Sequence, residues 1–191
     1  MIRKIKKYKI NIRPFAVSRL LKKTSAPENP VELPEEKIEE EIALANKFIA
    51  PSSLFGTFSK SQIPANLQTL LENSAKKTIS VSLIASTIGN AIEAEIEAAK
   101  RSGDVLKSSL LDSIAREALE QSVNFVIKLL NEEAKEENCE VSQPWTVDVS
   151  LSKDFLELLE SQKADISIGE TGPISPLYTK LCVCYWDPVR R

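Results

Sequence analysis

The sequence predicts an α+β fold, built from a mixed or antiparallel sheet with a long central helix and flanking helices. Stretches typical of strands and of helices follow one another without the regular repetition of a doubly wound sheet. One stretch, residues 105–137, is apolar over so much of its girth that it belongs at the centre of the fold. The 191 residues are expected to form one domain. An N-terminal strand, helix and proline-rich linker would occupy residues 1–33, and the main body residues 34–191.

The first sixty residues are expected to hold two strands and two helices. Apolar and polar residues alternate over residues 5–13, which is strand periodicity. A proline then opens a helix over residues 14–23, and three prolines make residues 24–34 an extended linker. Helical spacing of apolar residues predicts an amphipathic helix over residues 35–49, and residues 52–59 read as a short strand. The buried side of the first helix is expected to hold Phe15, Leu20 and Leu21.

The middle of the chain carries the clearest local signals. Pro64 opens a helix, and strict alternation over residues 78–86 predicts a strand. The helix over residues 88–102 is expected to end at Gly103, which can adopt the left-handed conformation that terminates helices. Asp104 is placed to cap the long helix that follows.

The C-terminal part is predicted to alternate between strands and a short helix. Residues 145–151 read as a strand, and Ser152 opens a helix. Residues 166–170 and 178–186 read as a final pair of strands, joined by a proline- and glycine-containing connection over residues 171–177.

Composition excludes several classes of site. Histidine is absent, which removes the usual general base, the Ser–His and Cys–His pairs and the commonest metal ligand. Only five glycines are present, and none forms a phosphate-binding loop. A net charge of -2 argues against a general nucleic-acid or membrane binder, although the first thirteen residues are basic and residues 35–41 acidic. No catalytic residue and no metal site is therefore expected.

The three cysteines indicate a reducing compartment, and the protein is expected to be cytoplasmic. Cys182 and Cys184 alternate on a predicted strand, so both thiols should point to one face as small buried apolar groups. Cys139 follows a charged helix end and is expected to be exposed.

Residues 83–130 carry a family resemblance. They contain LIASTIGNAIEAEI, then Asp104, then LLDSIAREALEQSVN. This order resembles the activation domain of cobalamin-dependent methionine synthase, in which a strand ends in a Thr-x-Gly turn before a helix. A Leu-Asp-Ala stretch then opens a long Ala/Glu helix. The matching residues are Thr87, Gly89, Leu111, Asp112 and Ser113, followed further on by Glu170 and Pro176.

The resemblance implies a stand-alone protein that binds S-adenosylmethionine and docks on a corrinoid protein or a cobalamin-dependent methyltransferase. In that family a reductant returns stalled cobalt(II) to cobalt(I), which takes the methyl group. The domain positions one ligand against the cofactor of another protein. The chain would contact cobalamin only when the cofactor is bound to the partner, because the chain has no histidine to ligate cobalt.

The resemblance also implies where a ligand would bind. The family signature Arg-x-x-Pro-Gly-Tyr falls on residues 139–144, which read CEVSQP and lack the arginine that would grip a carboxylate. Ligand-facing positions are implied at Glu133, Trp145 and Glu170, with Trp145 offering a cation–π face to a sulfonium. The alternative is a binding or scaffold protein of the same fold that has lost S-adenosylmethionine.

Overall fold

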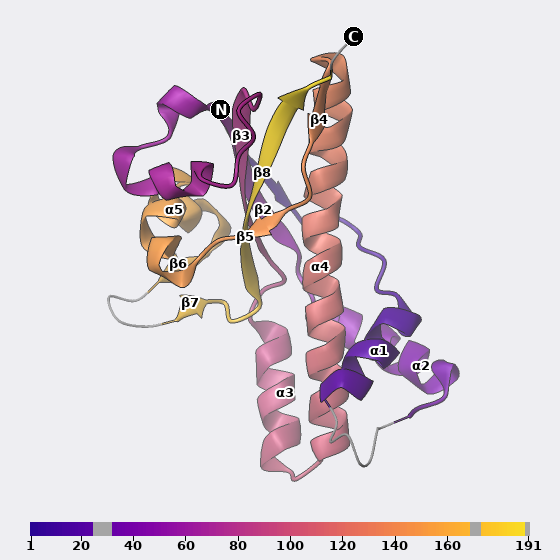
Figure 1. Ribbon diagram of the computed structural model, residues 1–191. Coiled ribbons are helices and arrows are strands. Elements are labelled where there is room, and N and C mark those ends of the chain that lie inside the picture. Colours follow the sequence, from indigo (N-terminus) through magenta and orange to yellow (C-terminus); the bar gives the residue numbers. More distant parts are fainter. Residues whose placement is uncertain (25–31, 169–172, 190–191) are drawn as a thin grey trace.

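The computed structural model describes residues 1–24, 32–168 and 173–189. Its main sheet is antiparallel at every pairing, with strand order β1-β2-β3-β8-β4 and the short β5 beside β8. The long helix α4 (Val105–Glu136) covers one face of this sheet and extends beyond its end (Figure 1). The predicted α+β class, with an antiparallel sheet and a long central helix, is confirmed.

The strands differ greatly in length. β2 (Ser52–Ser59), β3 (Ser80–Thr87) and β8 (Thr179–Pro188) form the body of the sheet. The remaining strands are β1 (Ile2–Lys6), β4 (Cys139–Val141) and β5 (Trp145–Thr146), and a separate ribbon pairs β6 (Ser167–Ile168) with β7 (Ile174–Ser175).

Four further α-helices accompany α4 in the described part of the chain: α1 (Pro14–Thr24), α2 (Glu35–Ala45), α3 (Ala91–Arg101) and α5 (Ser152–Leu158). Figure 1 shows α1, α2 and α3 gathered around the N-terminal half of α4, whereas α5 lies across the sheet from it. Short 3-10 helices are η1 (Asn46–Phe48), η2 (Lys60–Gln62), η3 (Ala65–Leu71), η4 (Val149–Leu151) and η5 (Ser161–Ala164).

Local signals determine the junction between α3 and α4. Gly103 adopts φ +77°, the left-handed conformation expected just past a helix end. Asp104 then caps α4, since its side chain accepts a hydrogen bond from the Lys107 N–H at 3.0 Å. Both capping predictions are confirmed.

Apolar side chains form three clusters. The sheet–α4 core holds Phe55, Ile84, Cys182, Cys184 and Trp186 against Val123, Val126 and Leu130. The sheet–α5 core holds Leu54, Val81, Leu83, Val183 and Tyr185 against Phe155, Leu156 and Leu67. The helical core holds Val17, Ile38, Ile92 and Ile114, among others, where α1 to α4 meet. Because both faces of β3 are covered, its residues from Val81 to Thr87 are all buried.

The N-terminal strand is shorter and earlier than predicted. β1 ends at Lys6, and Lys7 turns the chain with φ 55° while its N–H donates to the Pro51 carbonyl. The alternation beyond it reflects contacts with α4 and β2: the Tyr8 ring stacks on Phe125 of α4 with centroids 4.3 Å apart, and its hydroxyl hydrogen-bonds Ser122 of α4 and Ser53 of β2. The first helix is confirmed, but its phase differs, because Phe15 is 76% exposed and the buried residues are Ala16, Val17 and Leu21.

The C-terminal pairing was predicted wrongly. β8 pairs with β3 at the centre of the main sheet, and β6 pairs with the two-residue β7 instead. The strand predicted over residues 145–151 stops after Thr146, since the Asp148 side chain accepts from the Ser150 N–H and turns the chain into η4. The helix expected after Pro64 is the 3-10 helix η3, and β4 had no sequence signal strong enough to predict it.

Candidate functional site

Trp145 lines a cavity on the α5 side of the sheet. It occupies β5, paired opposite Val183 of β8, and its side chain is 50% exposed. The cavity has a volume of about 340 Å³ and lies between β5, β8 and the 3-10 helices η3 and η4. Besides Trp145, its lining includes Thr69, Asn73, Asp148, Val183 and Tyr185. An exposed aromatic face beside a concave, partly polar surface is a common form of small-molecule site.

The polar groups of this cavity are held in defined positions. The Asp148 carboxylate accepts hydrogen bonds from the Ser150 hydroxyl at 2.6 Å and the Ser150 N–H at 2.8 Å. The hydroxyl, followed by the amide, lowers the pKa of Asp148, so this carboxylate is charged at neutral pH. The Tyr185 hydroxyl donates to the Leu70 carbonyl at 2.7 Å and thereby ties η3 to the sheet. The cavity thus presents one negative charge, at Asp148, and two aromatic side chains, of which Trp145 is exposed and Tyr185 is buried.

Glu133 lies on the other side of the sheet. Its carboxylate forms a two-pronged ion pair with Arg3 of β1, in which the Arg3 Nη2 donates to Oε2 at 2.8 Å. The guanidinium also lies over the Phe55 ring, 4.4 Å from its centroid. Because Phe55 belongs to the sheet–α4 core, this pair joins the C-terminal half of α4 to the edge strand β1.

The three residues implied as ligand contacts are therefore not gathered in one place. Trp145 faces the α5 side, Glu133 faces the α4 side, and Glu170 lies outside the described residues. Residues 139–142 lie at the edge of the sheet: the Ser142 N–H donates to the Tyr185 carbonyl, and the Tyr185 N–H donates to the Ser142 Oγ.

A larger cavity, of about 510 Å³, lies beneath α5 and η5. Its charged lining is balanced, with two lysines, Lys153 and Lys163, and two glutamates, Glu157 and Glu160. Glu160 and Lys163 already pair with each other. No aromatic side chain is among its described lining residues, so it offers less chemistry for recognition than the smaller cavity at Trp145.

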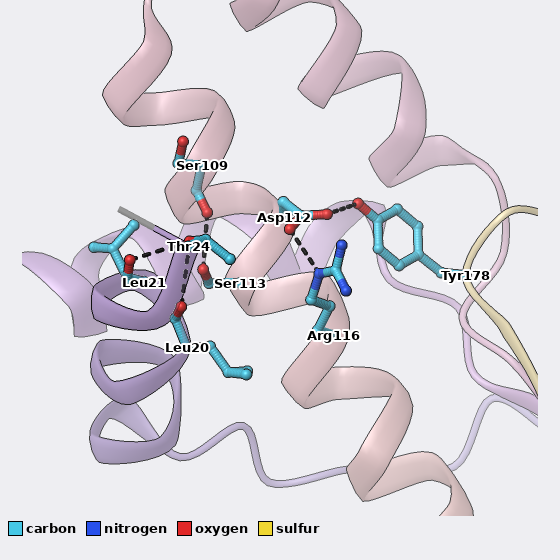
Figure 2. Close-up of polar contacts among 8 residues, drawn as sticks. All are labelled: Leu20, Leu21, Thr24, Ser109, Asp112, Ser113, Arg116 and Tyr178. Carbon is cyan, nitrogen blue, oxygen red and sulfur yellow. Dashed lines mark hydrogen bonds and ion pairs between the residues drawn. The ribbon is translucent and has the colours of Figure 1, made fainter. Parts of the chain in front are cut away.

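The Leu-Asp-Ser stretch of α4 has a structural role. Figure 2 shows Asp112 between two partners, accepting from the Tyr178 hydroxyl at 2.5 Å and from the Arg116 Nε at 2.7 Å. Burial first, and then this hydrogen bond, raise the pKa of Tyr178, which stays protonated. The same view shows Thr24 closing the end of α1 by donating to the Leu20 and Leu21 carbonyls. Asp112 thus attaches α4 to the residue that precedes β8.

An ion pair with a buried carboxylate, between Arg13 and Glu117, also escaped the sequence interpretation. Glu117 of α4 is only 3% exposed and accepts from the Arg13 Nε at 2.7 Å and from the Gln121 Nε2 at 2.8 Å. Its position, three residues after Ile114 and seven after Leu110, places it on the apolar side of the helix. That placement was the available signal, because a glutamate on an apolar side needs a partner.

All three cysteines are free and buried, which corrects the exposed position expected for Cys139. Cys139 starts β4 and packs in the sheet–α4 core together with Cys182 and Cys184. Burial raises the pKa of Cys182 to about 11 and that of Cys184 to about 12, and it also raises the pKa of Cys139. The thiols are therefore protonated at neutral pH and shielded from reagents.

We expect Ellman's reagent to leave all three thiols unmodified in the native protein at pH 8 and to modify all three in denaturant. In the folded protein the pKa values of Cys182 and Cys184 lie above the ordinary value of 9.0, so the protonated thiols favour the folded state. Their contribution to the free energy of unfolding is complete below about pH 9 and is lost as the pH rises through 11 to 12. Urea unfolding across that window would measure it, with the Cys182→Ala/Cys184→Ala variant as the control that flattens the slope. Rapid modification of a native thiol would contradict the buried placement.

The fold and its contacts define an α+β domain in which a long helix covers one face of an antiparallel sheet. No family model and no curated protein matches the chain. Chains of solved structures do match, among them a crystal structure of the MetH reactivation domain bound to AdoHcy, with a TM-score of 0.62 and 12% sequence identity. The match covers 100% of this chain and 80% of that chain. At this identity the likeness shows a shared fold, which by itself does not determine function.

Two further features of the described residues bear on the class of protein. No helix among them is long and apolar enough to cross a membrane. No cluster of three or more Cys, Asp or Glu side chains among them is arranged to hold a metal ion.

Proposed function

We propose that this chain binds S-adenosylmethionine at the Trp145 cavity and docks on a corrinoid protein, where it supports reductive reactivation. The observation that carries the proposal is the half-exposed Trp145 beside a cavity of about 340 Å³, on a fold shared along the whole chain with a domain solved bound to AdoHcy. The residues that resemble the methionine synthase activation domain support the same assignment.

The cavity suits a ligand with a positively charged centre. A sulfonium placed over the Trp145 ring would be attracted to the negative face of its π system. The Asp148 carboxylate adds a negative charge that its bonds to Ser150 keep ionised. Thr69 and Asn73, which also line the cavity, supply a hydroxyl and an amide for hydrogen bonds.

We expect calorimetric titration to detect S-adenosylmethionine binding at micromolar affinity. Replacing Trp145 by alanine should weaken it by about tenfold, because a desolvated cation–π contact contributes on the order of 1–2 kcal/mol. Phe15→Ala is the matched control: it also removes an exposed aromatic ring, but from α1, outside the cavity. Equal affinity for the parent and the Trp145→Ala variant would show that S-adenosylmethionine does not bind in this cavity.

The other two implied ligand residues enter the same titration as proposals. Glu133→Gln tests the α4 side of the sheet, where the carboxylate now pairs with Arg3. A loss of affinity in the Glu133→Gln variant alone would indicate that S-adenosylmethionine binds on the α4 side of the sheet. Glu170→Gln tests the third position.

The docking step needs a separate experiment. A cobalamin-dependent methyltransferase in its cobalt(II) state is mixed with a one-electron reductant and methyl-labelled S-adenosylmethionine, with and without the chain. We expect label to reach the corrinoid protein only when the chain is present, with one S-adenosylhomocysteine formed per methyl transferred. Equal labelling without the chain would contradict the proposal.

A second candidate is a binding protein of the same fold that has lost the ligand. The observation that favours it is the burial of Cys139 in the sheet–α4 core, at the position where the resemblance implies the signature arginine. A buried thiol cannot grip a carboxylate as an arginine does. Absence of heat and of any thermal shift at millimolar S-adenosylmethionine, with docking on the corrinoid protein retained, would select this candidate.

A further inference from the structure

A third cavity lies where helix α3 begins. It has a volume of about 380 Å³ and is lined by the ends of three strands, by the turn before α3 and by η5. The strand residues that line it are Lys6, Ser52 and Thr87, which sit opposite one another in the sheet register. Gly89 and Asn90 line it from the turn. It shares no described lining residue with the Trp145 cavity.

An unpartnered hydroxyl lines this cavity. Ser52 is 6% exposed, and within the described residues its Oγ has no hydrogen-bond partner. Side chains alternate along β2, so Ser52 shares the face of Leu54 and points away from α4, toward the side where η5 covers the sheet. A buried polar atom without a partner costs free energy, so such groups usually meet a ligand or an ordered water.

The start of α3 is open, in contrast to the start of α4. The Asp104 carboxylate occupies the first turn of α4, whereas among the described residues Asn90 makes no side-chain capping bond to α3. Gly89 has φ +81° and lies close to Ala50, which lets the backbone border the cavity directly. The first N–H groups of a helix have no partners within it, and with the helix dipole they favour an anion. The carboxylate of the first turn, Glu93, accepts a hydrogen bond from the Leu177 N–H.

Charges around the cavity favour the same kind of ligand. Lys6 and Lys7 line it, against one carboxylate, Asp165. Asp165 accepts a hydrogen bond from the Lys6 Nζ at 2.8 Å, and this bond lowers the pKa of the carboxyl. The lining therefore carries one positive charge in excess.

We propose that this cavity binds a small oxyanion, the phosphate or carboxylate group of a small molecule. The oxyanion accepts hydrogen bonds from the Ser52 hydroxyl and from the first N–H groups of α3, with Lys7 supplying charge. This site is independent of the function proposed above, since it rests on different residues.

The test is a titration of the whole chain with inorganic phosphate at constant ionic strength, followed through backbone amide signals in NMR. We expect saturable shifts at Gly89, Asn90 and Ala91. The amides of Val105 and Leu106, at the start of α4, are the internal control and should stay constant because Asp104 already caps that helix. A parallel titration with acetate distinguishes a phosphate site from a carboxylate site.

Three variants complete the test. Ser52→Ala should bind about tenfold more weakly, since it removes one hydrogen bond to a charged group. It should melt at or above the parent temperature in phosphate-free buffer, because the lost hydroxyl had no partner. Lys7→Ala should weaken binding about threefold, whereas Lys9→Ala, whose side chain does not line the cavity, should not change it. Undiminished binding by Ser52→Ala, or no saturable shift with either anion at tens of millimolar, overturns the proposal.

Discussion

Replacing Trp186 by alanine is expected to lower the free energy of unfolding by about 3–5 kcal/mol. The side chain is 2% exposed and fills the sheet–α4 core from β8. Its indole N–H donates to the Ser82 Oγ at 2.7 Å on the neighbouring strand. The substitution therefore removes apolar contacts, leaves a cavity and weakens the anchoring of Ser82, although that hydroxyl keeps its bond to Thr57.

Urea unfolding of the two tryptophan variants separates packing from exposure. Trp145 and Trp186 are the two tryptophans of the chain, so each variant keeps one fluorescent reporter. Trp145→Ala should cost less than about 1 kcal/mol, because the ring is half exposed and little apolar area returns to water. Equal losses in the two variants would contradict the position of Trp186 in the core.

Features determined by neighbouring residues were predictable from the sequence. The end of α3 at Gly103 and the cap of α4 at Asp104 depend on contacts within four residues, so composition and spacing were sufficient. Apolar residues on most sides of the helix also identified α4 as central, and α4 contacts α1, α2, α3 and the sheet.

Strand pairing was harder to predict because it joins residues far apart in the chain. The final strand was recognised, but alternation does not say which strand lies beside it, and β8 pairs with β3 about one hundred residues earlier. The same limit explains the extended segment around Tyr8. Its alternating pattern is real, but residues 8–13 are not part of a strand, and their buried side chains pack mainly on α4 and in the helical core.

The candidate site was predictable in part for the same reason. Trp145 was singled out through the family resemblance as a ligand-facing residue, and it lines a cavity in the structure. The partner of Glu133 is Arg3, 130 residues away, so no local pattern could show that this carboxylate is already paired. The cavity that we propose as an oxyanion site is formed by the ends of strands, η5 and the start of α3. These elements lie far apart in the sequence and come together only in the folded chain.

The ion pair between Arg13 and the buried Glu117 is expected to give the second large effect. Arg13→Ala should lower the free energy of unfolding by about 3 kcal/mol, because it leaves a buried carboxylate with Gln121 as its remaining partner. The value is set at the low end for a broken buried pair, since the Arg13 side chain is itself half exposed. The pair joins the residue before α1 to the middle of α4, so loss of it should loosen the N-terminal segment first.

A double variant decides whether the charge or the packing is responsible. Replacing both residues by leucine removes the uncompensated charge and keeps apolar volume, so stability should return to within about 1 kcal/mol of the parent. Arg116→Ala is the matched control, because that arginine pairs with the more exposed Asp112 on the same helix and should cost less than about 1 kcal/mol. If Arg13→Ala costs no more than Arg116→Ala, Glu117 finds water or another partner, and the pair does not hold the N-terminal segment on α4. If Arg13→Ala lowers the free energy of unfolding and the double leucine variant restores it, the helix tolerates an apolar residue at position 117. In that case Glu117 makes the contact with Arg13 specific and is not needed for the packing of α4.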